Sequence, residues 1–195
     1  MFIVIEGIDG AGCETQGKNL LKLLKEKDHS VSLIKYPNYE KNIGKIIRDF
    51  LYKNKSLTAN QQFLLYTTQF ILDKQFIQEK RKNQILIADR YFTTTLCYQT
   101  LEGFNEKFAL EYAKYFEIEK PDLIFYLDVS PETAIKRKYE ENKEKNRREK
   151  DFQFIRKTYQ KYQDLIKRQV WTKWIKINGE QEIEKITNEI AKFIL

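Results

Sequence analysis

The chain has few of the residues that build disulfide frameworks, metal clusters and unstructured linkers. Its 195 residues include only two cysteines, one histidine, seven glycines and three prolines. Two cysteines without a paired pattern exclude a disulfide framework, and the scarcity of Cys and His excludes a metal site built from them. The low Gly and Pro content excludes collagen-like and low-complexity chains.

Long apolar runs are missing as well. None reaches the roughly 18 residues that a membrane-spanning helix needs. Glu6 and Asp9 interrupt the first apolar segment, and no basic start typical of a secretory signal precedes it. We therefore expect no membrane association and, since nothing pairs the cysteines, a cytoplasmic location.

Apolar and charged residues are plentiful, at 42% and 32% of the chain, with 13 Phe, 12 Tyr and 2 Trp. This composition supplies a hydrophobic core and excludes wholesale disorder. At about 150 residues per typical domain, we expect one domain over residues 1–195 with a small lid.

Short apolar runs alternate with longer amphipathic ones. Buried strands are predicted at 2–5, 31–34, 85–88, 122–129 and 174–177, with helical segments between them, the longest at 60–80. Strands separated by helices predict an α/β fold of three layers (α/β/α) around a central five-stranded parallel sheet. Such sheets bind ligands at the carboxyl ends of their strands.

A glycine-rich segment, GIDGAGCET at 7–15, follows the first predicted strand and opens a helix. The spacing from Gly7 to Gly12 matches the phosphate-binding loop G-x-x-x-x-G-K-[ST], in which backbone N–H groups and a helix N-terminus face phosphate oxygens. Cys13 stands where that motif has lysine, and Glu14 stands where it has the hydroxyl that contacts magnesium. The motif predicts phosphate binding, with a plain strand-to-helix turn as the alternative.

The net charge of +7 suits either a nucleic-acid-binding or a polyphosphate-binding protein. The excess is local, because residues 136–150 hold eight basic and four acidic side chains. A local basic segment favours polyphosphate over nucleic acid, with a solvated helix end as the other interpretation.

Several segments, taken in order, resemble the thymidylate kinase family, whose members phosphorylate dTMP. They are FIVIEGIDGAGCETQ at 2–16, YPNY and IGK within 36–45, DRY and YQ within 89–99, KPDLIFYLDVSPE at 120–132 and INGEQEI at 177–183. The resemblance spans nearly the whole chain. It implies a P-loop NTPase-type fold with a basic lid at about 138–150, and a homodimer that transfers the γ-phosphate of ATP to dTMP with Mg²⁺.

For the acceptor side, the resemblance implies that Asp9 contacts the sugar, Arg90 and Tyr39 hold the phosphate, and Tyr98 disfavours ribose. Thr94, Thr95 and Gln99 are the further dTMP-binding candidates. Phe70 and Lys74, four residues apart on a helix, would stack on thymine and reach its carbonyl. In an alternative register Tyr66 stacks, but its partner would then be Phe70, which cannot donate.

For the donor side, the resemblance implies that ATP lies against Gly7, Asp9, Gly10, Ala11, Gly12, Cys13, Glu14 and Thr15, with Arg137, Asn178 and Gly179 flanking adenine. Glu14 and Asp89 are the magnesium candidates, and Asp89 would also orient Arg90.

The missing lysine has two explanations. In the first, cations of the lid neutralise the phosphates in place of the lysine. Arg147 and Arg148 are the preferred candidates, and Lys143 and Lys145 are the others. In the second, the protein binds nucleotides but transfers phosphate poorly. A kinase for another nucleoside monophosphate is a further alternative.

Overall fold

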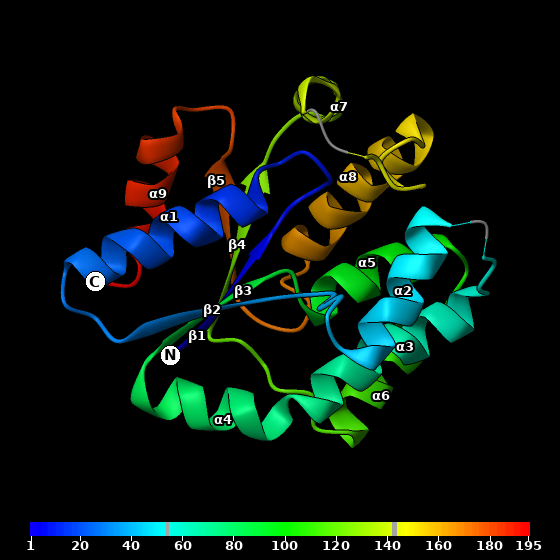
Figure 1. Ribbon diagram of the computed structural model, residues 1–195, viewed down its shortest axis with the longest axis horizontal. Coiled ribbons are helices and arrows are strands. Elements are labelled where there is room, and N and C mark those ends of the chain that lie inside the picture. The colour runs from blue at the N-terminus through cyan, green and yellow to red at the C-terminus, as the bar shows by residue number, and fades with distance from the viewer. Residues whose placement is uncertain (54, 142–143) are drawn as a thin grey trace.

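The computed structural model describes residues 1–53, 55–141 and 144–195. Within these ranges, five parallel strands form one sheet in the order β2-β3-β1-β4-β5. The strands are β1 (Phe2–Glu6), β2 (Val31–Lys35), β3 (Ile85–Asp89), β4 (Leu123–Asp128) and β5 (Trp174–Asn178). Helices cover both faces of this sheet (Figure 1), so the predicted α/β fold with a five-stranded parallel sheet is confirmed.

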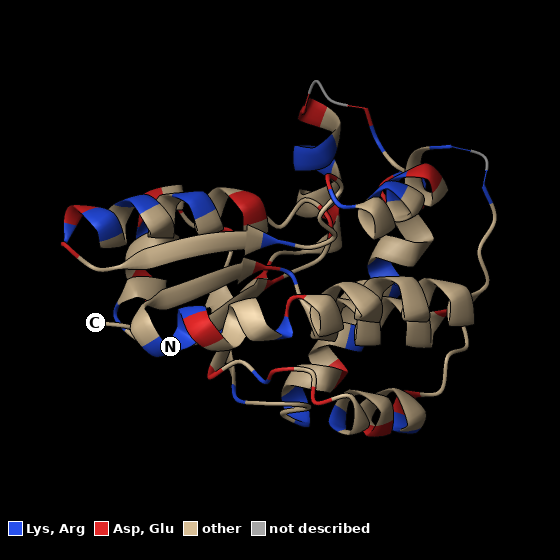
Figure 2. Ribbon diagram, turned by 60° about the horizontal axis from the view of Figure 1, so that its bottom comes forward, with Lys and Arg blue, Asp and Glu red and all other residues tan. Residues whose placement is uncertain are grey.

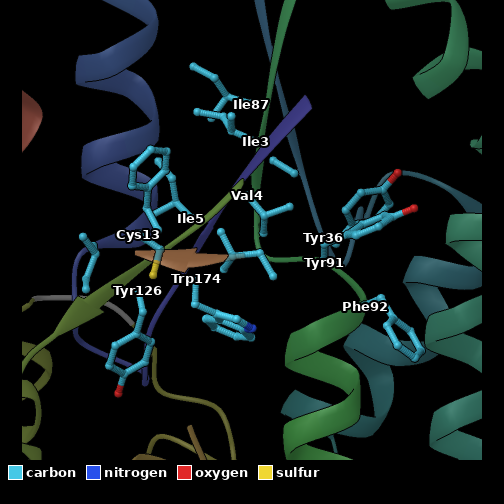
Figure 3. Close-up of a cluster of buried hydrophobic side chains, with 14 of the residues drawn as sticks. Ile3, Val4, Ile5, Cys13, Tyr36, Ile87, Tyr91, Phe92, Tyr126 and Trp174 are labelled. Carbon is cyan, nitrogen blue, oxygen red and sulfur yellow. The ribbon is translucent and has the colours of Figure 1, made fainter. Parts of the chain in front are cut away.

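β1 is the centre of the sheet and of the core. All five of its residues are buried, because β3 and β4 flank it and helices cover both of its faces. Figure 3 shows side chains from β1 and β3, such as Ile3, Val4, Ile5 and Ile87, in the buried cluster. Ile5 pairs with Asp89, so the carboxyl ends of these two strands lie side by side. This register brings the glycine-rich loop after β1 next to Asp89 and Arg90.

The described residues form helices in all the segments predicted to be helical. Their bounds are α1 (Cys13–Glu26), α2 (Asn42–Tyr52), α3 (Ala59–Leu72), α4 (Lys74–Asn83), α5 (Phe92–Leu101), α6 (Glu106–Tyr115), α7 (Pro131–Glu140), α8 (Phe152–Lys167) and α9 (Ile183–Ala191). None of these helices has the length and apolarity that crossing a lipid bilayer requires.

The helix predicted over 60–80 is divided at Asp73 into α3 and α4. The Asp73 carboxylate accepts a hydrogen bond from the Tyr36 hydroxyl at 2.9 Å and pairs with Lys41. These contacts tie the junction to the loop after β2. The division therefore depends on tertiary contacts that helical periodicity does not reveal.

The glycine-rich loop needs glycine at two positions. Gly10 and Gly12 have φ angles of 94° and 95°, which side chains rarely adopt. A Cβ atom on Gly10 would lie 2.2 Å from the carbonyl oxygen of Ala134, because α7 packs directly on the loop. Gly12 caps α1, and a Cβ there would meet no atom of the described residues within 4 Å.

Candidate active site

A cavity of about 370 Å³ opens at the carboxyl end of the sheet. Figure 2 shows charged residues at the ends of the strands in front. By sequence, the last residue of β2 is Lys35 and the last residue of β3 is Asp89. Most of the predicted site residues line this cavity: Asp9, Gly10, Gly12, Cys13, Glu14, Thr15, Tyr39, Asp89, Arg90, Thr94, Thr95, Tyr98, Gln99 and Arg148.

Arg90 is the fixed cation of the cavity. Its Nη2 lies 2.7 Å from Asp9 Oδ1, and its Nη1 donates to the Tyr98 hydroxyl at 3.3 Å. Its backbone has a φ of 66°, an uncommon conformation for a residue with a side chain. The Arg90 N–H donates to the carbonyl of Ile5 at 3.0 Å, which holds that conformation. The fold therefore places the guanidinium against the loop without a ligand.

Glu6 does not line the cavity but supports its wall, a role that the sequence interpretation missed. It is fully buried at the end of β1 and accepts from the backbone N–H groups of Tyr91 and Thr94 and from the hydroxyls of Thr93, Thr94 and Tyr162. Burial raises the pKa of this carboxyl. Glu6 thereby holds the N-terminal end of α5, which carries Thr94 and Tyr98. An acidic residue ending an apolar strand was the available signal.

Cys13 provides no charge at the position where the phosphate-binding motif has lysine. Its side chain belongs to the buried core, where Figure 3 draws it with Ile5 and Tyr126. A Cβ atom on Gly7 would lie 3.1 Å from Cys13 Sγ, so the sulfur packs beneath the loop. Burial raises the pKa of the thiol, which therefore stays neutral.

Glu14, in the first turn of α1, forms ion pairs with two lysines. Lys18 Nζ lies 2.6 Å from Glu14 Oε1, and Lys35 Nζ lies 2.5 Å from Glu14 Oε2. These ammonium groups lower the pKa of Glu14 to about 2. Lys35 Nζ is also 3.8 Å from Asp89 Oδ2. Asp89 is 3% exposed, and burial raises its pKa to about 6.

The donor chemistry of Glu14 and Asp89 fits a magnesium ion. Two carboxylates that share one lysine ammonium group lie on either side of a position where a cation is favourable. Magnesium prefers oxygen ligands and is commonly held by one or two carboxylates together with substrate phosphates. Among the described residues no group of three or more His, Cys, Asp or Glu side chains suits a metal ion.

The lid cations take different positions. Arg148 lines the cavity and pairs with Glu102 at 2.5 Å. Arg147 does not line it, because its guanidinium lies 4.4 Å from the Phe50 ring centroid and donates to the carbonyls of Lys53 and Lys55.

Of the other lid lysines, Lys145 donates to the carbonyl of Glu141, and Lys143 lies outside the described residues. Lys138, which sequence reasoning did not single out, lines the cavity and pairs with Glu141 and Glu149 at 3.0 and 2.8 Å.

The structure corrects the expected base-stacking pair. Phe70 is 1% exposed, and its ring packs against Tyr36 and Tyr91 with centroid distances of 4.9 and 4.6 Å. Lys74 pairs with Glu117 and does not line the cavity. The cavity is lined instead by Tyr66, with Gln62 one helical turn before it. Phe70 was misplaced because its apolar ring is retained by the core, which periodicity alone could not distinguish from a binding face.

The expected adenine residues meet outside the cavity. Arg137 Nη1 donates to the carbonyl of Gly179 at 3.0 Å, which joins α7 to the turn after β5. Asn178 precedes that glycine and accepts from the N–H of Glu180. Gly7 and Ala11 are buried in the loop and do not line the cavity either.

Comparison with known proteins gives one consistent family. The family model described as "Thymidylate kinase" matches residues 5–190. A "Probable thymidylate kinase" of Methanocaldococcus jannaschii is 32% identical to this chain, over 100% of the chain and 95% of that protein. One of Methanosphaera stadtmanae is 33% identical over 100% of the chain and 99% of that protein. A "Thymidylate kinase" of Caldanaerobacter subterraneus is 30% identical over 99% of the chain and 94% of that protein.

Proposed function

Because the chain belongs to the thymidylate kinase family, we propose that its cavity holds dTMP against Arg90 while ATP lies along the loop after β1. The protein is an ATP-dependent phosphotransferase, and its reaction is the phosphorylation of dTMP. The observation that carries the placement of the substrates is the side-by-side arrangement of the loop after β1 and the Asp89-Arg90 end of β3, both lining one cavity.

On the acceptor side, Arg90 receives the 5′-phosphate of dTMP. A guanidinium forms two parallel hydrogen bonds to a phosphate, and this one is already held by Asp9 and Tyr98. Asp9 remains within reach of the sugar hydroxyl, and Tyr98 excludes a ribose 2′-hydroxyl. Tyr39 lies near the phosphate, and the Tyr66 ring stacks on the base.

On the donor side, the triphosphate lies on the N-terminus of α1, and Glu14 and Asp89 would hold magnesium. Phosphoryl transfer leaves the protein mainly the tasks of alignment and charge neutralisation. Magnesium, when bound, neutralises charge on the phosphate oxygens. Asp89 must be ionised for this role, so protonation near pH 6 opposes it.

Lys18 and Lys35 supply the positive charge that Cys13 does not. Both are held by Glu14, the residue next to Cys13, and both line the cavity. The prediction that Arg147 neutralises the phosphates requires its guanidinium to leave Phe50 and the carbonyls of Lys53 and Lys55.

The function is tested by a coupled assay of the purified protein with ATP, Mg²⁺ and dTMP, dUMP, dCMP, dGMP or AMP. We expect turnover with dTMP. Turnover with another monophosphate but not with dTMP would overturn the substrate assignment. No turnover with any of them would favour a catalytically impaired nucleotide-binding protein.

The Cys13→Lys variant separates these interpretations. If the native chain is inactive and this variant is active, the loop has lost its function. If the native chain is active and the variant changes little, other cations already neutralise the phosphates.

We also propose a homodimer and a cytoplasmic location. Leu64, Leu72 and Phe76 are 51%, 67% and 40% exposed and recur at helical spacing along α3 and α4, as in an interface stripe. Cys13 and Cys97 are free thiols, which suits a reducing compartment. Sedimentation of the native chain and of Leu72→Glu tests the dimer, which the charge should dissociate.

A further inference from the structure

One wall of the cavity is polar although it is almost completely buried. This polar wall consists of Gln62 and Tyr66 of α3, Gln99 of α5 and Arg148 of the lid. Gln62 and Gln99 are 2% and 3% exposed, and the Arg148 side chain is 13% exposed. Burying so many hydrogen-bonding groups is costly unless they are paired, so the wall calls for a partner.

The hydrogen bonds within the polar wall leave specific groups unpaired. Gln62 Oε1 accepts from Gln99 Nε2 at 3.2 Å and from Arg148 Nη2 at 3.1 Å. Gln99 Oε1 is buried and has no hydrogen-bond partner among residues 1–53, 55–141 and 144–195. Within the described part of the chain, the side-chain bonds of Arg148 all involve Nη2, so the N–H donors of Nη1 remain available. Because Gln99 Oε1 is enclosed by the protein, the group that the wall offers to the cavity is the charged Nη1 donor of Arg148.

Arg148 is held in place before any ligand arrives. Its guanidinium lies 4.3 Å from the Phe154 ring centroid and 5.8 Å from that of Phe50, and it pairs with Glu102 at 2.5 Å. The neighbouring Arg147 N–H donates to the carbonyl of Leu51 at the C-terminal end of α2. These contacts anchor Arg147 on α2 and fix the Arg148 guanidinium against the cavity wall.

The available N–H donors of Arg148 complement the C4 carbonyl of a pyrimidine-2,4-dione. Thymine and uracil present an N3–H donor beside a C4 carbonyl acceptor. Cytosine presents the reverse, a ring-nitrogen acceptor beside an amino donor. A donor from Arg148 pairs with the C4 carbonyl of the first pattern and is opposed by the amino donor of the second. Tyr66 in the same wall supplies a ring on which the base stacks.

We propose that Arg148 is a specificity-determining residue that reads the C4 carbonyl of the acceptor base, and that it does not act on the phosphates. This inference rests on the proposed function of the same cavity. It replaces the expectation that Lys74 or Phe70 faces the base carbonyl. Lys74 pairs with Glu117 outside the cavity, and Phe70 has no hydrogen-bond donor on its side chain. The lid thereby carries a residue that recognises the acceptor.

The test compares the native protein with Arg148→Ala, Arg148→Lys and the control Arg156→Ala. Arg156 lies on α8, is 52% exposed, and pairs only with Glu132 among the described residues. Steady-state kinetics with dTMP, dUMP and dCMP are combined with calorimetry of dTMP and dCMP binding without ATP. The calorimetry measures base recognition independently of catalysis, and circular dichroism confirms that each variant is folded.

We expect Arg148→Ala to raise the KM for dTMP and dUMP about 10- to 100-fold and to weaken dTMP binding similarly. The kcat and the KM for ATP should stay within about threefold, and the preference for dTMP over dCMP should fall by at least about tenfold. Arg148→Lys keeps the charge without the planar fork and should give an intermediate loss. The control should match the native protein.

A fall in kcat of about a hundredfold without a change in dTMP binding would overturn the proposal and assign Arg148 to the phosphates. An unchanged preference for dTMP over dCMP would overturn it as well. Failure of the proposed function looks different, because the native protein itself would then neither bind nor phosphorylate dTMP.

Discussion

The acceptor and donor halves of the cavity are built in opposite ways. In the acceptor half the Asp9 and Arg90 side chains are 18% and 17% exposed and are already paired. In the donor half the charged side chains of Lys18, Lys35 and Glu14 are 65%, 49% and 44% exposed. Folding therefore fixes the groups that we propose hold dTMP, whereas the cations that we propose face ATP lie on long and exposed side chains.

We expect the largest effect on catalysis when Arg90 of the acceptor half is substituted. Arg90→Ala should lower kcat/KM for dTMP by about two to four decades, because a preorganised phosphate contact in a buried site is lost. Arg90→Lys should recover only part of this loss, since lysine lacks the planar fork. On the donor side, Lys18→Ala should lower kcat/KM less than about tenfold, because Lys35 still reaches Glu14. Equal losses for Arg90→Ala and Lys18→Ala would contradict the contrast between the halves.

The next effect concerns the support beneath the acceptor half. Glu6→Ala should lower the free energy of unfolding by about 3 kcal/mol, because two backbone N–H groups and three hydroxyls lose their acceptor in the core. Glu6→Gln keeps one oxygen and should cost about 1 kcal/mol. Urea unfolding at pH 7 measures both. Equal stability of the two variants would show that Glu6 does not hold α5.

The same contrast explains what the sequence could predict. The strands and the turns of the glycine-rich loop could be predicted because their signals are local. A short apolar run marks a buried strand, and closely spaced glycines mark a backbone with positive φ angles. Glu6, Lys35 and Gln62 acquire their roles from partners distant in the chain, such as Tyr162 for Glu6. The misplacement of Phe70 has the same origin, since only the packing of Tyr36 and Tyr91 shows that its ring belongs to the core.

A smaller effect tests the border between the halves, at Asp89. Burial raises its pKa to about 6, whereas an unfolded aspartate titrates near about 3.9. Between these values the native state keeps a proton that the unfolded state has released. The contribution of Asp89 to stability therefore falls as the pH rises from about 4 to about 6, and stays low above that.

Asp89→Asn removes this dependence and should be more stable than the native protein at pH 8, by on the order of 2 kcal/mol. At pH 4.5 the difference should be much smaller. Urea unfolding of both proteins at the two pH values measures it, and other titrating groups cancel in the comparison. If the difference in the free energy of unfolding did not change with pH, Asp89 would not be a buried carboxyl with a raised pKa.

The smallest effect sharpens the assignment of the base position. Lys74→Ala should leave the KM for dTMP within about twofold and the free energy of unfolding within about 0.5 kcal/mol. Its only ion pair in the described residues is with Glu117, which is 75% exposed. Tyr66→Leu should raise that KM about tenfold, because a ring that stacks on the base is replaced by a side chain without a π face. Steady-state kinetics of both variants decide whether the base lies beside Lys74 or beside Tyr66. If Lys74→Ala raised the KM tenfold and Tyr66→Leu did not, the base would lie beside α4, and the polar wall would face an empty part of the cavity.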